Sequence, residues 1–220
     1  MIEVIDIRKS YGSLHVLRGV SLSVPDSCIA AIVGPSGAGK STLLHIIGTL
    51  DRPDAGRVLY DGTDVASMSD RKLSRFRNSH IGFVFQAHQL LPEFTLLENV
   101  MMPALIAGKS PSQAAALARP LLAEVGLTDR ENHKPTELSG GEAQRGAVAR
   151  ALVNSPSVVL ADEPSGSLDS RNRRELHDIF FRLRDLHGTT FVTVTHDESL
   201  AARCDRVFRI TDGELSPCVI

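Results

Sequence analysis

One glycine-rich segment has the residue types and the spacing to bind phosphate. Residues 34–41 read Gly-Pro-Ser-Gly-Ala-Gly-Lys-Ser and match the pattern G-x-x-x-x-G-K-[ST] in full. The glycines would let backbone N–H groups face phosphate oxygens, and a helix starting after the loop would add the positive end of its dipole. Lys40 would then reach the β- and γ-phosphates, and the Ser41 hydroxyl would ligate Mg²⁺. The segment predicts that the chain handles a nucleoside triphosphate.

An acidic pair after an apolar run would supply the second part of such a site. Val158–Ala161 is predicted to be a buried strand, and Asp162 and Glu163 follow it directly. Asp162 would hold Mg²⁺ through water, and Glu163 would polarise an attacking water. Alone, an acid at a strand end is more often a helix cap or an ion-pair partner. Beside the phosphate-binding pattern, the catalytic interpretation is favoured.

A second glycine-rich segment, Leu-Ser-Gly-Gly-Glu at residues 138–142, has two interpretations. Ser139, Gly140 and Gly141 open a predicted helix and offer hydroxyl and backbone N–H donors to an anion. A serine followed by glycines is also an ordinary helix N-cap. On residue types alone, the two interpretations are equally good.

The elements that must position these residues follow from the hydrophobic pattern. Short apolar runs alternate with helical periods, which predicts an α/β protein. Cys28–Val33 is predicted to be a buried strand leading into the phosphate-binding loop, with a helix over Lys40–Leu50 after it. Further strands are predicted at Ile2–Ile7, Val20–Val24, Ile81–Phe85, Val158–Ala161 and Phe191–Thr195, the first two as an antiparallel pair.

The middle of the chain is predicted to be helical throughout. From Thr95 to Asn154 no segment has the pattern of a strand, and apolar residues recur at helical spacing. Pro120 lies inside this pattern and is a residue type that kinks helices. One helix is predicted from Ser139 to about Asn154, and a later one carries an apolar stripe from Leu176 to Leu186.

Composition and charge narrow the function classes. The net charge of −2 and the isoelectric point near 6.4 give no electrostatic reason to expect nucleic-acid binding. No apolar run reaches the ~20 residues that span a bilayer, and Met1–Lys9 does not have the pattern of a signal peptide. The cysteines form no C-x-x-C pair, so they are predicted to be reduced thiols of a cytoplasmic protein, with Cys28 buried. They are Cys28, Cys204 and Cys218.

In their order along the chain, the motifs resemble those of the ATP-binding cassette (ABC) ATPases, and the resemblance covers essentially the whole sequence. Gly34–Thr42 is similar to the Walker A motif, Val158–Asp162 to the Walker B motif, and Leu138–Arg145 to the signature motif. The resemblance implies an α/β fold: a P-loop NTPase (RecA-like) core, an N-terminal antiparallel β subdomain and an inserted all-helical subdomain. The expected division of the single domain 1–220 is a nucleotide-binding core at 1–86 and 155–220, with the helical subdomain at about 87–154.

The resemblance also implies roles for single residues. Tyr11 is similar to the aromatic residue that stacks on adenine, Gln86 to the Q-loop residue that links the metal to a transport partner, and Ser167–Asp169 to the D-loop. Glu163 would be the general base, and His196, the switch histidine, would contact the γ-phosphate. The residues expected to bind ATP are Tyr11, Gly34, Pro35, Ser36, Gly37, Ala38, Gly39, Lys40, Ser41, Thr42, Gln86, Ser139, Gly140, Gly141 and Asp169. Those expected to hold Mg²⁺ are Ser41, Gln86 and Asp162.

Two kinds of partner are implied. Two copies would face head to tail, each binding MgATP between its own phosphate loop and the partner's Ser139–Gly141. Membrane permease subunits would dock near Gln86–Phe94, where Leu90, Leu91, Pro92 and Phe94 form an apolar loop. It is equally consistent with the pattern that Leu90 and Phe94 only pack the joint between the core and the helical insert.

Two segments indicate a subgroup of the family. Ile47–Gly56 and Ile81–Thr95 resemble the ATP-binding subunits of bacterial lipoprotein-releasing systems. This implies a peripheral protein on the cytoplasmic face of the inner membrane, whose ATP hydrolysis drives release of lipoproteins through separate membrane subunits. The ATPases of macrolide-type efflux and cell-division complexes remain alternatives within the family. A small-molecule kinase is the alternative from another class, and Ser139–Gly141 together with Glu163 counts against it.

The sequence departs from the family's usual pattern at a few positions. Glu142 stands where the broad family most often has Gln, and Ser165 and Ser167 stand where Thr and Asn are usual. Gly146 lies inside the predicted signature helix, where glycine costs about 1 kcal/mol relative to alanine. Its presence suggests that another helix approaches closely there.

Overall fold

Two β-sheets organise the protein, whose computed structural model describes residues 1–216. The antiparallel sheet has the order β2-β1-β4-β5 and the larger sheet the order β10-β9-β3-β8-β7-β6. The antiparallel strands are β1 (Ile2–Tyr11), β2 (Leu14–Val24), β4 (Ala55–Tyr60) and β5 (Thr63–Asp64). The larger sheet comprises β3 (Ile29–Val33), β6 (Ile81–Phe85), β7 (Val158–Asp162), β8 (Thr190–Val194), β9 (Arg206–Thr211) and β10 (Glu214–Ser216).

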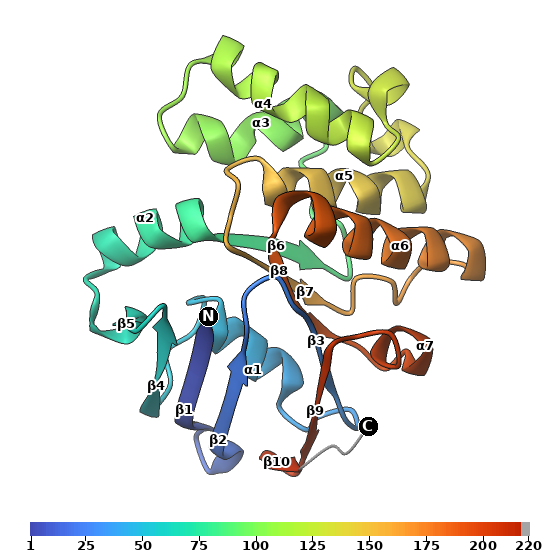
Figure 1. Cartoon of the computed structure of the whole chain (residues 1–220). Coiled ribbons are helices and arrows are strands. Elements are labelled where there is room, and N and C mark those ends of the chain that lie inside the picture. The colour runs from blue at the N-terminus through green and yellow to red at the C-terminus, as the bar shows by residue number, and fades with distance from the viewer. Residues whose placement is uncertain (217–220) are drawn as a thin grey trace.

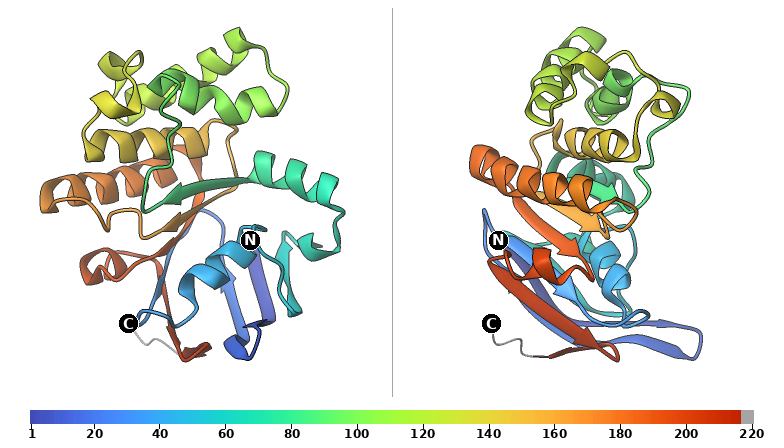
Figure 2. Two further views of the ribbon diagram at one scale, coloured as in Figure 1. Left: turned by 180° about the vertical axis from the view of Figure 1, so that it is seen from behind. Right: turned by 90° about the vertical axis from the view of Figure 1, so that its right-hand side faces the viewer.

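Helices cover the larger sheet from both sides. They are α1 (Lys40–Ile47), α2 (Asp70–His80), α3 (Leu96–Ile106), α4 (Pro111–Glu124), α5 (Gly140–Leu152), α6 (Ser170–His187) and α7 (Glu198–Ala201). Figure 1 shows α3, α4 and α5 stacked above the sheet, with α1 and the antiparallel strands below it. The side view in Figure 2 shows the same layers, with the antiparallel strands at the end opposite to α3 and α4.

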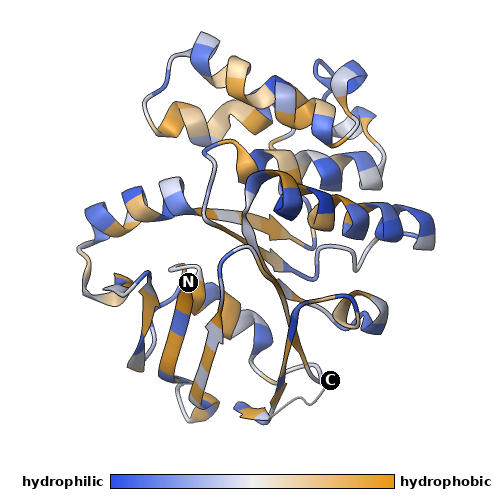
Figure 3. Ribbon diagram, viewed as in Figure 1, coloured by the Kyte–Doolittle hydropathy of each residue, from blue (hydrophilic) through white to orange (hydrophobic). Residues whose placement is uncertain are grey.

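Strand β3 contributes to two hydrophobic cores because its side chains alternate between the two faces of the sheet. Ile29 and Ala31 pack in a cluster with residues of α3 to α6. Ala30 and Ile32 pack in the other cluster, with α1 and the antiparallel strands. Burial on both faces accounts for the continuous apolar run, and the hydropathy colouring in Figure 3 shows it as an orange strand at the centre of the molecule.

The three α-helices between β6 and β7 begin with the same capping motif. Thr95, Ser110 and Ser139 each form a capping box with the Glu or Gln three residues later. Each such cap stabilises its helix by about 1 kcal/mol. Helix α4 continues through Pro120, so the proline does not end it. No strand lies between β6 and β7, as the pattern predicts.

Most predicted elements are present, with shifted ends. The antiparallel pair, the strands at Ile81–Phe85 and Val158–Asp162, and the helices at α1, α5 and α6 are confirmed. Leu186 is 60% exposed, so its predicted place on the buried stripe of α6 is wrong; the stripe ends at Leu183. Cys28 is buried immediately before β3. Cys218 lies outside the described residues.

The hydrophobic pattern did not predict α2, β4, β5, β9 or β10. Helix α2 buries only Leu73, since nearly all its other side chains are polar. Within residues 1–216, none of the helices combines the length and apolar character needed to cross a bilayer.

Candidate functional site

The carboxyl ends of four parallel strands meet at one edge of the larger sheet. Phe85 pairs with Asp162, Asp162 with Val194, and Val194 with Ile32, so β6, β7, β8 and β3 end level with one another. The segments that follow these strands begin at Gly34, Gln86, Glu163 and Thr195. Ligands of open α/β sheets bind at such an edge. The topology therefore brings together four of the predicted motifs.

The loop after β3 has the backbone that an anion site requires. Gly37 and Gly39 have φ angles of +78° and +95°, in the left-handed region that favours glycine. Gly39 is the N-cap of α1, and no side chain caps that helix. Its first N–H groups are therefore available to a phosphate. Gly34 permits close packing, because a Cβ there would lie 2.0 Å from the carbonyl oxygen of Ile210.

Lys40 turns its ammonium group toward this loop, and Ser41 turns its hydroxyl toward the end of β7. Lys40 Nζ donates to the carbonyl oxygens of Gly34 and Pro35 at 3.0 and 2.9 Å. Ser41 Oγ donates to Asp162 Oδ1 at 2.9 Å. A hydroxyl and a carboxylate side by side are hard oxygen ligands of the kind that Mg²⁺ prefers.

A cavity of about 350 Å³ lies against these groups. It is lined by Val16, Ser36, Gly37, Gly39, Lys40, Ser41, Thr42, Gln86, Asp162 and Glu163. The structure thus collects predicted phosphate, metal and catalytic residues from the ends of three strands. Tyr11, Ser139, Gly140, Gly141, Asp169 and His196 do not line this cavity.

The Glu163 carboxylate and the His196 imidazole contact each other through Glu163 Oε2 and His196 Nδ1. Glu163 has a φ angle of +48°, which is strained for a residue with a side chain, and its N–H donates to the carbonyl oxygen of Val194 at 2.9 Å. The backbone of Glu163 is therefore held at the strand end, beside the cavity that its side chain lines. The His196 side chain is 68% exposed, so the imidazole remains open to a further contact. Both are residue types that general acid–base catalysis uses.

Tyr11 lies at the end of β1, and its ring is held by a residue that sequence reasoning missed. The Tyr11 hydroxyl donates to Asp51 Oδ2 at 2.5 Å, and Lys9 Nζ donates to Asp51 Oδ1 at 2.9 Å. Burial opposes ionisation of Asp51, but these hydrogen bonds outweigh it and hold the pKa of the carboxyl below its ordinary value. Asp51 is thus a fixed anion that orients Tyr11, whose side chain is otherwise exposed.

Ser139 begins α5 outside the cavity. Its amide and its hydroxyl both donate to Glu142 Oε2 at 2.8 Å, and its Oγ accepts the Glu142 N–H at 3.3 Å. Arg130 Nε donates to the other oxygen, Glu142 Oε1, at 2.9 Å. The Ser139 amide first, and Arg130 next, lower the pKa of Glu142 to about 2. The predicted helix cap is therefore present, and it engages the hydroxyl and the amide of Ser139.

Asp169 caps α6 and does not point a free carboxylate into the cavity. It accepts the N–H groups of Arg171 and Asn172, both at 2.9 Å, and the side-chain amide of Asn172 at 2.6 Å.

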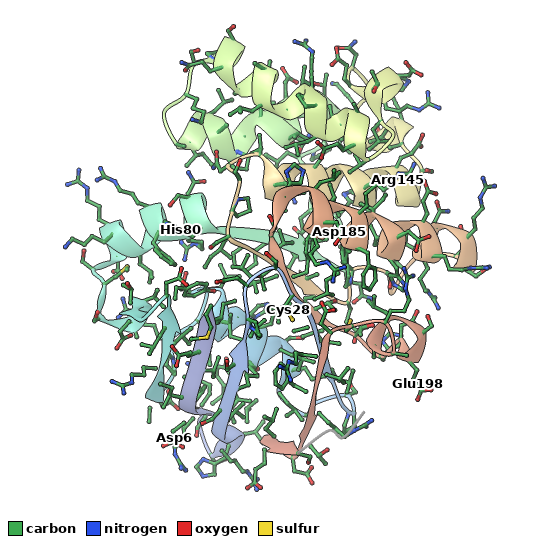
Figure 4. The ribbon with its side chains drawn as sticks, viewed as in Figure 1. Asp6, Cys28, His80, Arg145, Asp185 and Glu198 are labelled. Carbon is green, nitrogen blue, oxygen red and sulfur yellow. The ribbon has the colours of Figure 1, made fainter. Side chains whose placement is uncertain are left out.

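Helix α5 also contacts its neighbours away from its first turn. Arg145 forms an ion pair with Glu175 of α6 at 3.1 Å, and Figure 4 labels Arg145 on α5. The close contact suggested at Gly146 is present: a Cβ there would lie 2.5 Å from Leu96 Cδ1 of α3.

Some residues of the apolar loop after Gln86 pack the joint between the core and the helical insert, and others are exposed and free to contact a partner. Leu90 is 6% exposed and packs in the core, whereas Leu91 and Phe94 are 42% and 38% exposed. The Asn99 side chain holds the loop, donating to the carbonyl oxygens of Leu91 and Phe94 and accepting the Leu91 N–H. No helical or strand pattern identifies Asn99 as the anchor of this loop, because its partners Leu91 and Phe94 lie before the start of α3.

A cavity of about 540 Å³ lies beside this loop, between α2, β6, α3 and α5; we call it the β6 groove. Its apolar lining includes Leu50, Phe83, Phe85, Pro103 and Ile106, and its basic lining Arg77 and Arg150. Leu50 and Ile106 are 46% and 70% exposed.

Comparisons with known proteins agree with this geometry. The model of a family described as ABC transporter matches residues 17–166. The chain is 61% identical to the lipoprotein-releasing system ATP-binding protein LolD of Bacteroides thetaiotaomicron, over 98% of this chain and 99% of that protein. It is 60% identical to LolD of Porphyromonas gingivalis, over 98% of each chain. A dimeric post-hydrolysis structure of the ATP-binding cassette MJ0796 bound to ADP and Pi matches with a TM-score of 0.90 at 37% identity, over 99% of this chain and 97% of that one. The chain belongs to the ABC transporter family.

Proposed function

We propose that this chain is the ATP-hydrolysing subunit of an ABC complex that releases lipoproteins from the inner membrane through separate membrane subunits. One observation carries the ATPase part: Lys40, Ser41, Asp162 and Glu163 lie around one cavity at the ends of parallel strands. The lipoprotein part is supported by the name of relatives that are 61% and 60% identical over nearly the whole chain.

ATP and Mg²⁺ fit the groups around the cavity. The loop amides and Lys40 would hold the β- and γ-phosphates after Lys40 exchanges the carbonyl oxygens of Gly34 and Pro35 for phosphate oxygens. The Ser41 hydroxyl and the Asp162 carboxylate would hold Mg²⁺, with Gln86 at the same cavity. When bound, Mg²⁺ would neutralise charge on the phosphate oxygens.

Glu163 would act as the general base. Its carboxylate lines the cavity and would accept the proton of an attacking water. His196, which already contacts that carboxylate, would keep it oriented and donate to the γ-phosphate from its exposed side. Tyr11, held by Asp51, would stack on the base of the nucleotide.

A second copy of the chain would complete the site. Ser139, Gly140 and Gly141 do not line the cavity that their own chain forms, which suits them to a nucleotide bound by another copy. Two copies placed head to tail would each offer the start of α5 to the other's γ-phosphate. The related cassette MJ0796 is dimeric in its ADP- and Pi-bound structure.

Membrane subunits would dock at the β6 groove and at the exposed side chains of Leu91 and Phe94. Exposed apolar residues beside a groove suit a short amphipathic helix of a partner, and Arg77 and Arg150 would favour an acidic one. This would hold the chain peripherally on the cytoplasmic face of the inner membrane.

The test is ATP-dependent release of lipoprotein. The chain would be co-purified with its membrane subunits and reconstituted into vesicles that carry a lipoprotein, with Glu163→Gln as the matched inactive variant. We expect the wild-type complex alone to transfer lipoprotein to a soluble acceptor when ATP is added. A complex that hydrolyses ATP but expels a macrolide, or activates cell-wall hydrolysis, and leaves the lipoprotein in place would support one of the alternative complexes.

A further inference from the structure

We propose that Arg130 is a positioning residue: by neutralising Glu142, it allows the start of α5 to accept the γ-phosphate of a nucleotide bound by a second copy. The inference rests on the proposed head-to-tail arrangement and deepens it. It concerns a residue outside every motif, on the short helical turn Thr128–Arg130 that follows α4.

Glu142 places a negative charge where a phosphate would have to bind. Its Oε2 accepts both the amide and the hydroxyl of Ser139, each at 2.8 Å, so the carboxylate lies over the N-terminus of α5. Its lowered pKa keeps it ionised at neutral pH. A carboxylate at this place interacts well with the helix dipole, but it repels an incoming phosphate.

The Ser139 hydroxyl also has only one proton to donate. In the resting chain that proton goes to Glu142, so binding of a phosphate requires the hydroxyl to change its partner. The less the charge of the Glu142 carboxylate is neutralised, the more strongly it holds the hydroxyl proton, and the harder that exchange becomes. A chain with Gln at this position would not face the problem, since an amide carries no charge.

Arg130 is the cation that offsets this charge. Its Nε donates to Glu142 Oε1 at 2.9 Å, on the side of the carboxylate turned away from Ser139. The Glu142 side chain is 21% exposed and that of Arg130 is 46% exposed, so the pair is only partly screened by water. Among the residues the structure describes, Arg130 is the basic side chain within ion-pair distance of Glu142. It therefore weakens both the repulsion of a phosphate and the hold on the Ser139 proton.

Dimerisation of the full-length chain tests the inference. Glu163→Gln is the parent because slow hydrolysis would preserve an ATP-bound dimer, and sedimentation velocity with Mg²⁺ and ATP gives its dissociation constant. Into this parent we would introduce Arg130→Ala, Glu142→Gln and both together. Glutamine at position 142 still completes a capping box, so the helix start is retained.

We expect Arg130→Ala to raise the dissociation constant about tenfold, since a loss of roughly threefold at each of two sites is typical of one partly exposed charge pair. Adding Glu142→Gln should restore the constant to within about twofold of the parent. Restoration is decisive, because a direct contact of Arg130 with phosphate, or a purely structural role, would not be rescued by removing the negative charge.

Arg119→Ala is the matched control. It removes a similar ion pair nearby, from Arg119 Nε on α4 to Glu131 Oε2 just after the turn that carries Arg130, at 3.0 Å, and should leave the constant unchanged. If Arg130→Ala dimerises as tightly as the parent, or if Glu142→Gln fails to restore it, the inference is overturned while the proposed function stands. If the parent does not dimerise with ATP at all, the two-copy arrangement is wrong, and the inference that rests on it is wrong as well.

Discussion

The Asn172 side chain lies where a Cβ of Gly141 would be: a Cβ built on Gly141 would come within 2.2 Å of Asn172 Oδ1. Asn172 is itself held by Asp169, which accepts both its N–H and its side-chain amide. The first turn of α6 is thereby joined to the first turn of α5. The glycine is required here by a neighbour, independently of any ligand.

Gly141→Ala should destabilise the protein by about 1–3 kcal/mol, because Asn172 must leave Asp169 to make room for the methyl group. Gly140→Ala is the control, since its Cβ would be 4.0 Å from the nearest atom, Leu168 Cδ2. Alanine there should be neutral or slightly stabilising. Urea unfolding of both variants measures the difference, and equal free energies of unfolding would contradict the contact.

Glu163→Gln should bind ATP but hydrolyse it at least about 10²-fold more slowly, because the amide cannot accept the proton of water. Phosphate release and equilibrium ATP binding measure the two effects separately. Glu198→Gln, at an exposed position in the first turn of α7, should keep the wild-type rate. A Glu163→Gln variant that turns over at the rate of Glu198→Gln would exclude Glu163 as the base.

Asp51→Asn should raise the KM for ATP about three- to tenfold with little change in kcat, because Tyr11 would lose its fixed orientation but the phosphate groups would not move. Tyr11→Phe, which keeps the ring and loses the hydroxyl, should behave alike. Tyr11→Ala should have the largest effect on KM. Steady-state kinetics check the series, and a fall in kcat at constant KM would assign Asp51 another role.

The capping box of α5 should make stability depend on pH. The pKa of Glu142 is about 2 in the folded protein, below its ordinary value of 4.5, so the charged form stabilises the fold. This contribution is complete above about pH 5 and is lost as the pH falls from there toward 2. Because the side chain is partly exposed, we expect it to amount to about 1–2 kcal/mol.

Glu142→Gln should therefore lower the free energy of unfolding at pH 7, and the difference from wild type should shrink steadily on acidification below pH 5. Urea unfolding at several pH values measures this. A difference that stays constant between pH 7 and pH 3 would mean that the charge does not stabilise the cap.

The sequence predicted the site residues whose role depends on their own type and local spacing. The glycines of residues 34–39 and the acids after β7 follow from patterns within one segment. Asp51, Asn172 and Arg130 act through partners that lie 40, 31 and 12 positions from them in the chain. Such pairs meet only in the folded chain: the segment after α1 meets β1, α6 meets α5, and the turn Thr128–Arg130 meets α5. No local pattern identifies them.

The same distinction explains the elements that were missed. Helix α2 presents mostly polar side chains, and β9 is mostly exposed or half-buried, so neither carries the apolar signal of a buried element. Both are positioned by neighbours: β9 pairs with β3, and α2 leads into β6.

Because the side chains of β3 alternate between two hydrophobic cores, this strand affects how the protein unfolds. Ile29 and Ala31 belong to the core beneath the helices, and Ala30 and Ile32 to the core beside the antiparallel sheet. Neither core can melt without uncovering one face of the strand that the other depends on. Unfolding is therefore expected to be a single cooperative transition, in which the two halves of the molecule share one melting temperature.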